Sequence, residues 1–278
     1  MPTGSTQSPG FLARSPIPGY FLLTFAISWL GALAVAAPHL LHHEALARIT
    51  GILMFPAMLL GPCFSGVLVA YLVDGPAGER DLFFRMFSFA FAKRWLLFIL
   101  LPPILVLGVL LVLTRLVSPA YSPNLFLLGV LFGVPAGVLE EIGWTGFAFP
   151  KMRSQIHFLP AAVLLGLLWS AWHLPVIDFL GVASPHGTYL FPFFLAFTLA
   201  MTAMRVLISW LYANTNSILL AQLLHISSTG ALVIFGAAHV NASQETLWYA
   251  VYGSVLWLVV FLLLRTSSQE LFSNYRRL

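Results

Sequence analysis

Eight apolar stretches, each long enough to cross a bilayer, constrain most strongly how this chain can fold. A membrane-spanning helix needs about 20 mostly apolar residues. Only 8% of this sequence is charged, whereas soluble domains carry roughly 25% charged residues. The sequence therefore predicts an all-α polytopic membrane protein with about eight transmembrane helices, approximately at 20–37, 52–73, 95–117, 125–149, 159–180, 189–212, 217–236 and 247–264.

The basic residues are distributed unevenly between the two ends of these spans. If the spans alternate in direction, one side of the membrane receives eleven Lys and Arg residues and the other receives only Arg48 and Arg115. Cytoplasmic loops carry the excess of basic residues in membrane proteins, so both termini are expected to be cytoplasmic. We accordingly divide the chain into a disordered cytoplasmic tail at 1–19, a single transmembrane domain at 20–264 and a cytoplasmic tail at 265–278.

The segment between the second and third spans, 74–94, combines charged residues with several phenylalanines. This pattern is typical of an amphipathic helix that lies on the membrane interface. The sequence has no basic stripe that could follow a phosphate backbone. We therefore expect the lipid bilayer, and not nucleic acid, to be a partner of this chain.

Two adjacent carboxylates, Glu140 and Glu141, interrupt the run 125–149, which is otherwise without charge. A charged side chain near the centre of a bilayer costs at least ~2.5 kcal/mol, so an ionisable residue there indicates a functional site. Two neighbouring carboxylates also repel each other. At least one of them must be protonated, or the pair must have cationic or hydrogen-bonding partners.

Histidines on two other predicted spans could supply such partners. Glu140 and His225 each lie about ten residues from the cytoplasmic end of their span, whereas His173 lies about fourteen residues in, or about 6 Å further out at 1.5 Å per residue. A carboxylate beside a neutral imidazole can orient and deprotonate a water molecule. A second histidine could donate to the oxyanion that forms when this water attacks a carbonyl. The predicted active site therefore lies between the fourth, fifth and seventh spans and is equipped for non-covalent amide hydrolysis.

Other hydrolytic chemistries lack their motifs in this sequence. There is no His-Glu-x-x-His pair, no Gly-x-Ser-x-Gly elbow and no phosphate-binding glycine loop that ends in Lys. The predicted spans also contain no pair of aspartates. These absences leave the Glu140 region as the candidate for catalysis.

The order of short blocks along the chain resembles the CAAX prenyl endopeptidase and bacteriocin-processing family of intramembrane proteases, also called the Abi or CPBP family. That family has the blocks Glu-Glu-x-x-x-Arg, Phe-x-x-x-His and His-x-x-x-Asn, with the last block after an Arg…Trp-Leu-Tyr-x-x-Thr-x-Ser stretch. The matching segments here are EEIGWTG at 140–146, WSAWH at 169–173, RVLISWLYANTNS at 205–217, and His225. The resemblance places the protease core at about 125–236.

The resemblance implies that Glu140 and His173 activate the hydrolytic water and that His225 helps to bind the oxyanion. It also implies supporting roles at positions that depart from the family pattern. The arginine expected one turn after Glu141 is replaced by Thr145. Arg205 is then a candidate substitute partner for Glu141, or Glu141 is protonated and bonds to Thr145.

Two further positions in the blocks differ from the family pattern. Trp169 stands where the family has Phe, and Thr229 stands where it has Asn. A threonine can still donate one hydrogen bond, but it has less reach than an asparagine amide.

The favoured function is an intramembrane endopeptidase acting on a membrane-associated substrate, with prenylated CAAX-type proteins as one such class. The alternatives are an inactive relative that acts as a bacteriocin-immunity or scaffolding protein, and a proton-coupled transporter. A mechanism without a metal ion is preferred. The alternative is a zinc ion held by Glu140, His173 and His225. The plasma membrane of a bacterial or archaeal cell is the expected location.

Overall fold

The computed structural model describes residues 11–266 and contains helices but no strand within that range. The regular elements are, in order, α1 (Phe11–Arg14), α2 (Pro16–Leu41), α3 (Arg48–Phe87), η1 (Lys93–Leu100), α4 (Leu101–Leu116), η2 (Pro119–Tyr121), η3 (Leu127–Gly129), α5 (Val130–Gly143), η4 (Trp144–Ala148), α6 (Phe149–Arg153), α7 (Phe158–Trp172), η5 (Ile177–Phe179), η6 (Gly187–Tyr189), α8 (Leu190–Thr215), α9 (Ile218–Phe235) and α10 (Ala242–Thr266). The predicted all-α architecture is confirmed.

Seven helical stretches of residues 11–266 are long and apolar enough to cross a membrane, not the eight expected. The eighth apolar helix, α7, has 15 residues and ends at Trp172, although a span at 159–180 was predicted. The reason lies in Pro175, because the residue that precedes a proline is driven away from the helical conformation. The chain continues from Trp172 through tight turns into η5. His173 is therefore the C-cap residue of α7 and does not lie inside a helix.

The N-terminal helices begin earlier than the sequence indicated. Residues 11–19 were assigned to a disordered tail, but α1 and the first turn of α2 occupy this stretch. A proline in the first turn of a helix loses no hydrogen bond and has a suitable φ, which explains why α2 begins at Pro16. The remaining parts of the two predicted tails, 1–10 and 267–278, lie outside the described residues.

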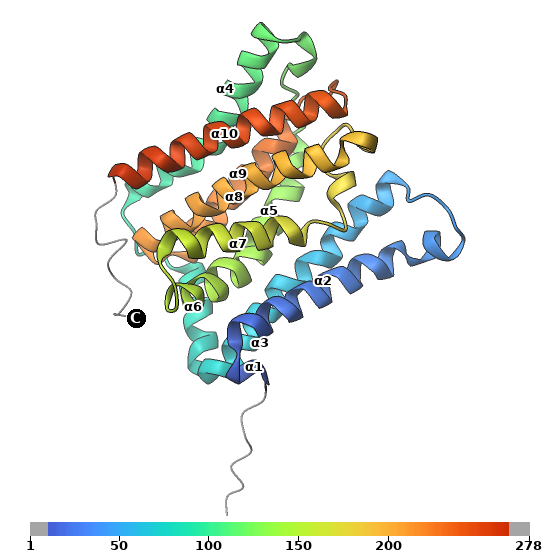
Figure 1. Cartoon of the computed structure of the whole chain (residues 1–278). Coiled ribbons are helices and arrows are strands. Elements are labelled where there is room, and N and C mark those ends of the chain that lie inside the picture. Colours follow the sequence, from blue (N-terminus) through green and yellow to red (C-terminus); the bar gives the residue numbers. More distant parts are fainter. Residues whose placement is uncertain (1–10, 267–278) are drawn as a thin grey trace, which may run out of the picture.

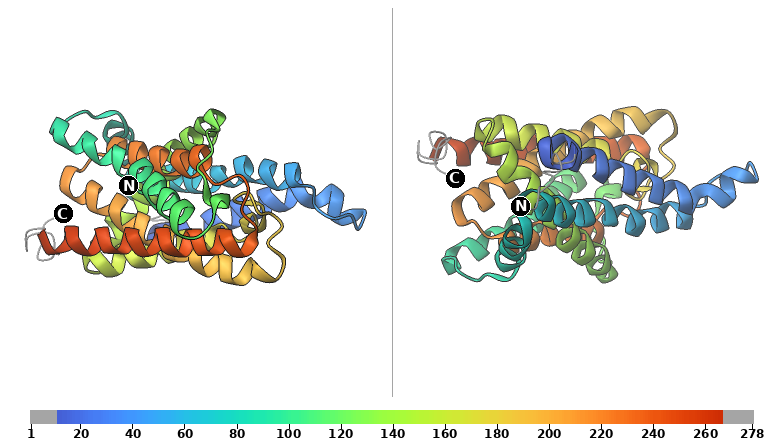
Figure 2. Two further views of the ribbon diagram at one scale, coloured as in Figure 1. Left: turned by 90° about the horizontal axis from the view of Figure 1, so that it is seen from above. Right: turned by 90° about the horizontal axis from the view of Figure 1, so that it is seen from below.

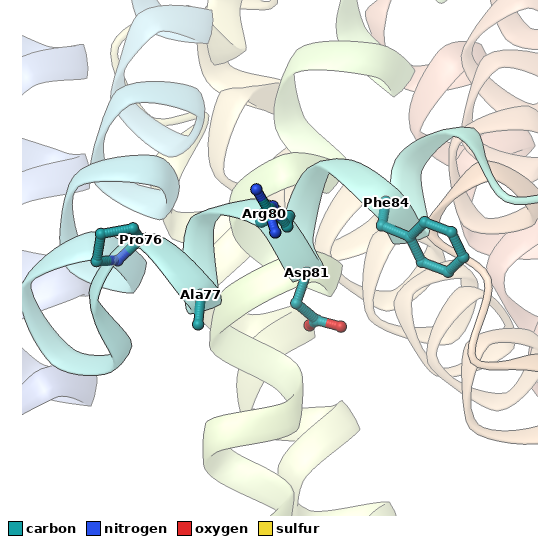
Figure 3. Close-up of a pocket in the computed structure, with 5 residues that line it drawn as sticks. All are labelled: Pro76, Ala77, Arg80, Asp81 and Phe84. Carbon is teal, nitrogen blue, oxygen red and sulfur yellow. The ribbon is translucent and has the colours of Figure 1, made fainter.

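Helix α3 bends sharply at Gly75, beyond the end of the predicted second span. Gly75 has a φ of 67° and a ψ of −162°, a conformation that strongly favours glycine. The helix that follows covers most of the segment expected to be amphipathic. It buries Leu82 and Met86 and exposes Phe84, and Figure 3 shows Arg80 and Phe84 beside a shallow surface pocket on this helix.

The helices pack so that α5 lies in the interior of the bundle. Figure 1 shows α2 and α3 side by side along one flank, α10 along the other, and α5, α7, α8 and α9 between them; the two views of Figure 2 agree with this order. Small residues let α5 approach its neighbours closely, as is common between transmembrane helices. A Cβ on Gly137 would lie 2.7 Å from the Ile226 backbone nitrogen of α9, and one on Gly66 of α3 would lie 2.8 Å from the Gly143 Cα.

We predict that Gly143→Ala destabilises the protein by about 1–3 kcal/mol, the usual cost of overpacking. A Cβ at this position would lie 2.2 Å from the Pro62 carbonyl oxygen and 2.4 Å from the Tyr20 hydroxyl. The matched control is Gly108→Ala in α4, where a Cβ meets no atom within 4 Å. Thermal unfolding in detergent should show a lower midpoint for Gly143→Ala alone. Equal midpoints for the two variants would contradict the close approach of α2, α3 and α5.

Candidate active site

The structure brings the ionisable residues singled out in the spans into one buried group. Glu140 and Glu141 lie at the end of α5, Arg205 lies in α8, His225 lies in α9 and His173 caps α7. Each of the five is at most 5% exposed. Side chains from four separate helices therefore meet around the glutamate pair.

The glutamates directly precede an unusual turn of the helix. The five residues after α5, Trp144–Ala148, form the π-helical turn η4, a conformation that is rare and frequent at functional sites. The Gly146 carbonyl in this turn accepts a hydrogen bond from Arg85 Nη2 at 3.3 Å. The same guanidinium donates to the Tyr212 hydroxyl at 2.7 Å, so Arg85 holds the π-helical turn against α8.

Glu141 has a full set of partners. Arg205 donates from Nη1 to Oε2 at 2.8 Å and from Nη2 to Oε1 at 2.9 Å. The Thr145 hydroxyl also donates to Oε2, and His225 Nδ1 lies 2.6 Å from Oε1. Four donors around one carboxylate are satisfied best by its ionised form, which only accepts hydrogen bonds. Arg205 and Thr145 thus both contact Glu141, and the arginine comes from another helix instead of the following turn.

Glu140 is held in a different way. Its Oε2 accepts hydrogen bonds from two indoles, at 3.1 Å from Trp144 Nε1 and at 2.6 Å from Trp169 Nε1. Its Oε1 is buried and has no hydrogen-bond partner among residues 11–266. Within residues 11–266 no cationic side chain forms an ion pair with Glu140. One oxygen of this carboxylate is therefore fixed by the indoles, and the other accepts no hydrogen bond from a described residue.

Trp169 lies at the centre of the site. Its ring centroid is 5.6 Å from that of His173 and 5.1 Å from that of His225. The Arg205 guanidinium carbon lies 4.3 Å from the same ring, which is a cation–π contact. Because the indole also donates to Glu140, one side chain orders both histidines, the arginine and the free carboxylate. The family pattern marks this position only as the Phe that Trp169 replaces and does not predict this role.

The hydrogen bonds of the two histidines determine which ring nitrogen carries a proton. His173 Nδ1 lies 2.8 Å from the Trp169 carbonyl oxygen, which can only accept, so Nδ1 is the donor. The Nε2 of neutral His173 then carries a lone pair. His225 Nδ1 donates in the same way to the Glu141 carboxylate. His225 can therefore donate a hydrogen bond from Nε2 only when it is protonated.

Two residues of the region differ from the expectation. Thr229 lies one turn after His225 on α9 and is half-buried, but the structure gives it no hydrogen bond to another described residue. Trp144 was not assigned a role, yet it binds Glu140. The spacing of four residues between Glu140 and Trp144 places both on one helix face and could have indicated this contact.

The zinc alternative requires Glu140, His173 and His225 to turn their ligating atoms toward one point. Among residues 11–266, no three His, Cys, Asp or Glu side chains converge closely enough to hold a metal ion. Glu140 Oε2 is occupied by indole donors, and His225 Nδ1 is occupied by Glu141. Glu140 Oε1, His173 Nε2 and His225 Nε2 remain outside these bonds, so the preference for a site without metal stays a prediction.

The fold and the site define a class of protein: a multi-pass membrane protein that resembles CAAX prenyl endopeptidases. Two comparisons with known proteins point to the same class. The family described as type II CAAX prenyl endopeptidase Rce1-like matches residues 122–231, which include the whole site. A CAAX prenyl protease 2 of Methanococcus maripaludis is 26% identical over 230 residues, covering 74% of this chain and 80% of that protein. The resemblance identified from the short sequence blocks is confirmed.

We predict that Arg205→Met destabilises the protein by about 3–5 kcal/mol, the cost of leaving one member of a buried ion pair without its partner. The double variant Arg205→Met/Glu141→Gln should recover part of this loss, because it removes the uncompensated carboxylate as well. Unfolding midpoints of the single and double variants in detergent measure the effect. If the losses of stability caused by Arg205→Met and by Glu141→Gln simply add in the double variant, the ion pair does not contribute the stability assigned to it.

Proposed function

We propose that this protein is an intramembrane endopeptidase that cleaves a peptide bond in a membrane-associated, prenylated CAAX-type substrate. The comparisons support a peptidase of the CAAX prenyl protease kind. The proposal rests above all on Glu140, whose carboxylate has one oxygen bonded to two indoles and one without a hydrogen-bond partner among the described residues. His173 lies against the same indole with a lone pair on Nε2.

In the proposed reaction, Glu140 Oε1 acts as the general base. It accepts a proton from a water molecule that His173 Nε2 helps to orient, and the water oxygen bonds to the carbonyl carbon of the substrate. The carbon–nitrogen bond then breaks, and the proton held by Glu140 passes to the leaving amine. The products are a carboxylic acid and an amine, so one water molecule is consumed and no covalent enzyme intermediate forms.

His225 is the proposed donor to the oxyanion. Its Nε2 donates only from the imidazolium, and the Glu141 carboxylate at 2.6 Å from Nδ1 is the group that stabilises this positive charge. Arg205 opposes it, because a second cation already pairs with Glu141. Glu141 therefore orients His225 and offsets its charge, and we assign it no direct contact with substrate.

Access from the cytoplasm is part of the proposal. The chain leaves the glutamate helix through α6, which ends in Lys151 and Arg153, and an excess of such residues is typical of the cytoplasmic side. A prenylated substrate would then reach the site from the inner leaflet. We place the protein in the plasma membrane of a bacterial or archaeal cell, with the bilayer and the substrate protein as its partners.

We predict that Glu140→Gln abolishes cleavage of a prenylated CAAX-type reporter in proteoliposomes, lowering turnover by about 100-fold or more through loss of the general base. The matched control is Glu44→Gln, because Glu44 is exposed in the loop between α2 and α3 and should leave turnover unchanged. Residual cleavage at the wild-type rate would exclude Glu140 as the base. A pH-dependent flux across the liposome membrane without proteolysis would instead support a transporter.

We predict that cleavage does not require a metal ion. Turnover measured after incubation with a strong chelator should equal that of untreated protein, because the proposed base and oxyanion donor are side chains. Metal analysis of the same purified sample provides an independent readout. Loss of turnover on chelation, with recovery on adding zinc alone, would contradict this mechanism.

A further inference from the structure

A second group of polar side chains, buried at His186 and Glu245 and partly exposed at Asp178, lies at the end of α7 away from α6. His186 is 2% exposed, and its Nδ1 lies 3.1 Å from Asp178 Oδ1 while its Nε2 lies 3.3 Å from Glu245 Oε2. The His186 backbone nitrogen also donates to Asp178 Oδ1 at 2.8 Å. The imidazole is thus placed between two carboxylates, one from η5 and one from the first turn of α10. We call these three residues the carboxylate–histidine cluster.

Glu245 also fixes the backbone of the loop between α7 and α8. Its two carboxylate oxygens accept hydrogen bonds from the Val182 and Ala183 backbone nitrogens, each at 2.9 Å. The loop runs so close to this carboxylate that a Cβ on Gly181 would lie 2.3 Å from Glu245 Oε1. Gly181 has a φ of 77°, a conformation readily available to glycine. In Figure 1 this loop lies beside the start of α10.

A short series of turns connects the cluster to His173. The Val176 backbone nitrogen donates to the His173 carbonyl at 2.9 Å, and the Phe179 nitrogen donates to the Val176 carbonyl at 2.9 Å. Val176 and Ile177 are buried at 1% and 5% exposure. Asp178 belongs to the second of these turns. Fixing Asp178 therefore restricts the backbone that carries the His173 side chain.

A second connection runs through aromatic rings. The His186 ring stacks on Phe193 of α8, with centroids 3.9 Å apart. Phe193 lies 6.2 Å from Phe197 by the same measure, and Phe197 lies 5.1 Å from His173. Tyr249 of α10 contacts the Phe193 ring at 5.1 Å. A change in the position of His186 would thus reach His173 both through the loop backbone and through packed side chains.

We propose that Asp178, His186 and Glu245 position His173 for catalysis, so that proton binding by His186 changes the turnover rate. The three residues lie at the end of the bundle opposite Lys151 and Arg153. The proposal rests on the proposed function, since it concerns the histidine that orients the water. The cluster does not touch the reacting atoms, and its three members act through the loop that His173 begins.

The charges around His186 set the direction of its titration. Burial lowers the pKa of His186, but the contacts with the Glu245 and Asp178 carboxylates outweigh it and raise the pKa above the ordinary value. A further charged group that contacts this loop is Arg48 of α3, which donates to the Gly181 carbonyl at 3.1 Å. A raised pKa means that the cluster stabilises the protein fully below pH ~6.5, the pKa of an unperturbed histidine. This stabilisation is lost as the pH rises through the pKa of His186 in the folded protein.

The test compares Asp178→Asn, His186→Gln and the control His42→Gln, whose side chain is exposed in the loop between α2 and α3. Asparagine keeps an oxygen that can accept both hydrogen bonds from His186 but removes one carboxylate charge. In wild type, the unfolding temperature and kcat should each change with pH around a transition pH. In Asp178→Asn, we expect both transition pH values to be lower than in wild type by about one unit. His186→Gln should remove this transition and lower kcat about tenfold at pH 6, with KM unchanged, through misplacement of His173.

The outcomes separate the two proposals. If wild type cleaves the reporter and both Asp178→Asn and His186→Gln show the same pH profile of cleavage as wild type, the positioning role is overturned. The proposed function then still stands. An unfolding transition that shifts as expected in a protein with no peptidase activity at any pH overturns the proposed function and the coupling to turnover with it. A parallel change in His42→Gln also overturns the assignment, because it shows that histidine removal at this end has a general effect.

Discussion

The buried ion pair between Glu141 and Arg205 is the interaction on which the rest of the site depends. A carboxylate cannot remain ionised in an apolar bundle without partners, and here the guanidinium bonds to both of its oxygens. The pair joins α5 to α8, and the His225 bond to the same carboxylate joins α9 to both. The geometry of three helices is thereby fixed around a single charged group.

In this arrangement the two adjacent glutamates differ in their hydrogen bonding. Glu141 is fully bonded, so it orders the site. Glu140 keeps one oxygen without a hydrogen-bond partner among the residues described, which is why we propose it as the base. Trp169 connects the two halves, because it donates to Glu140 and lies against Arg205 and both histidines. Truncation of Trp169 would remove its contacts with Glu140, Arg205 and both histidines.

Sequence alone predicted the features that depend on local pattern. The long apolar runs predicted an all-helical membrane protein, and the carboxylates inside one of them indicated the candidate site. The predicted end of the fifth span was wrong, because the apolar run continues past Pro175 although the helix itself ends before this proline. As a result His173 was placed inside a span, whereas it is the C-cap of α7.

Contacts between distant parts of the chain were harder to predict. Arg205 was one of two candidate solutions for Glu141, since 64 residues separate the two in sequence. No sequence pattern indicates Glu245, because two of its contacts are with the Val182 and Ala183 backbone nitrogens and the third, His186, lies 59 residues earlier in the chain. Such bonds leave no residue-type signal. The carboxylate–histidine cluster therefore required the structure.

The two adjacent glutamates have unequal roles, and unfolding midpoints of Glu140→Gln and Glu141→Gln, measured side by side in detergent, distinguish these roles. Glu141→Gln should lower the midpoint strongly, because it leaves the Arg205 cation buried without its carboxylate. Glu140→Gln should leave the midpoint unchanged or raise it, because the amide oxygen still accepts from the indoles and a buried charge is removed. Equal losses in the two variants, or a larger loss in Glu140→Gln, would contradict the account.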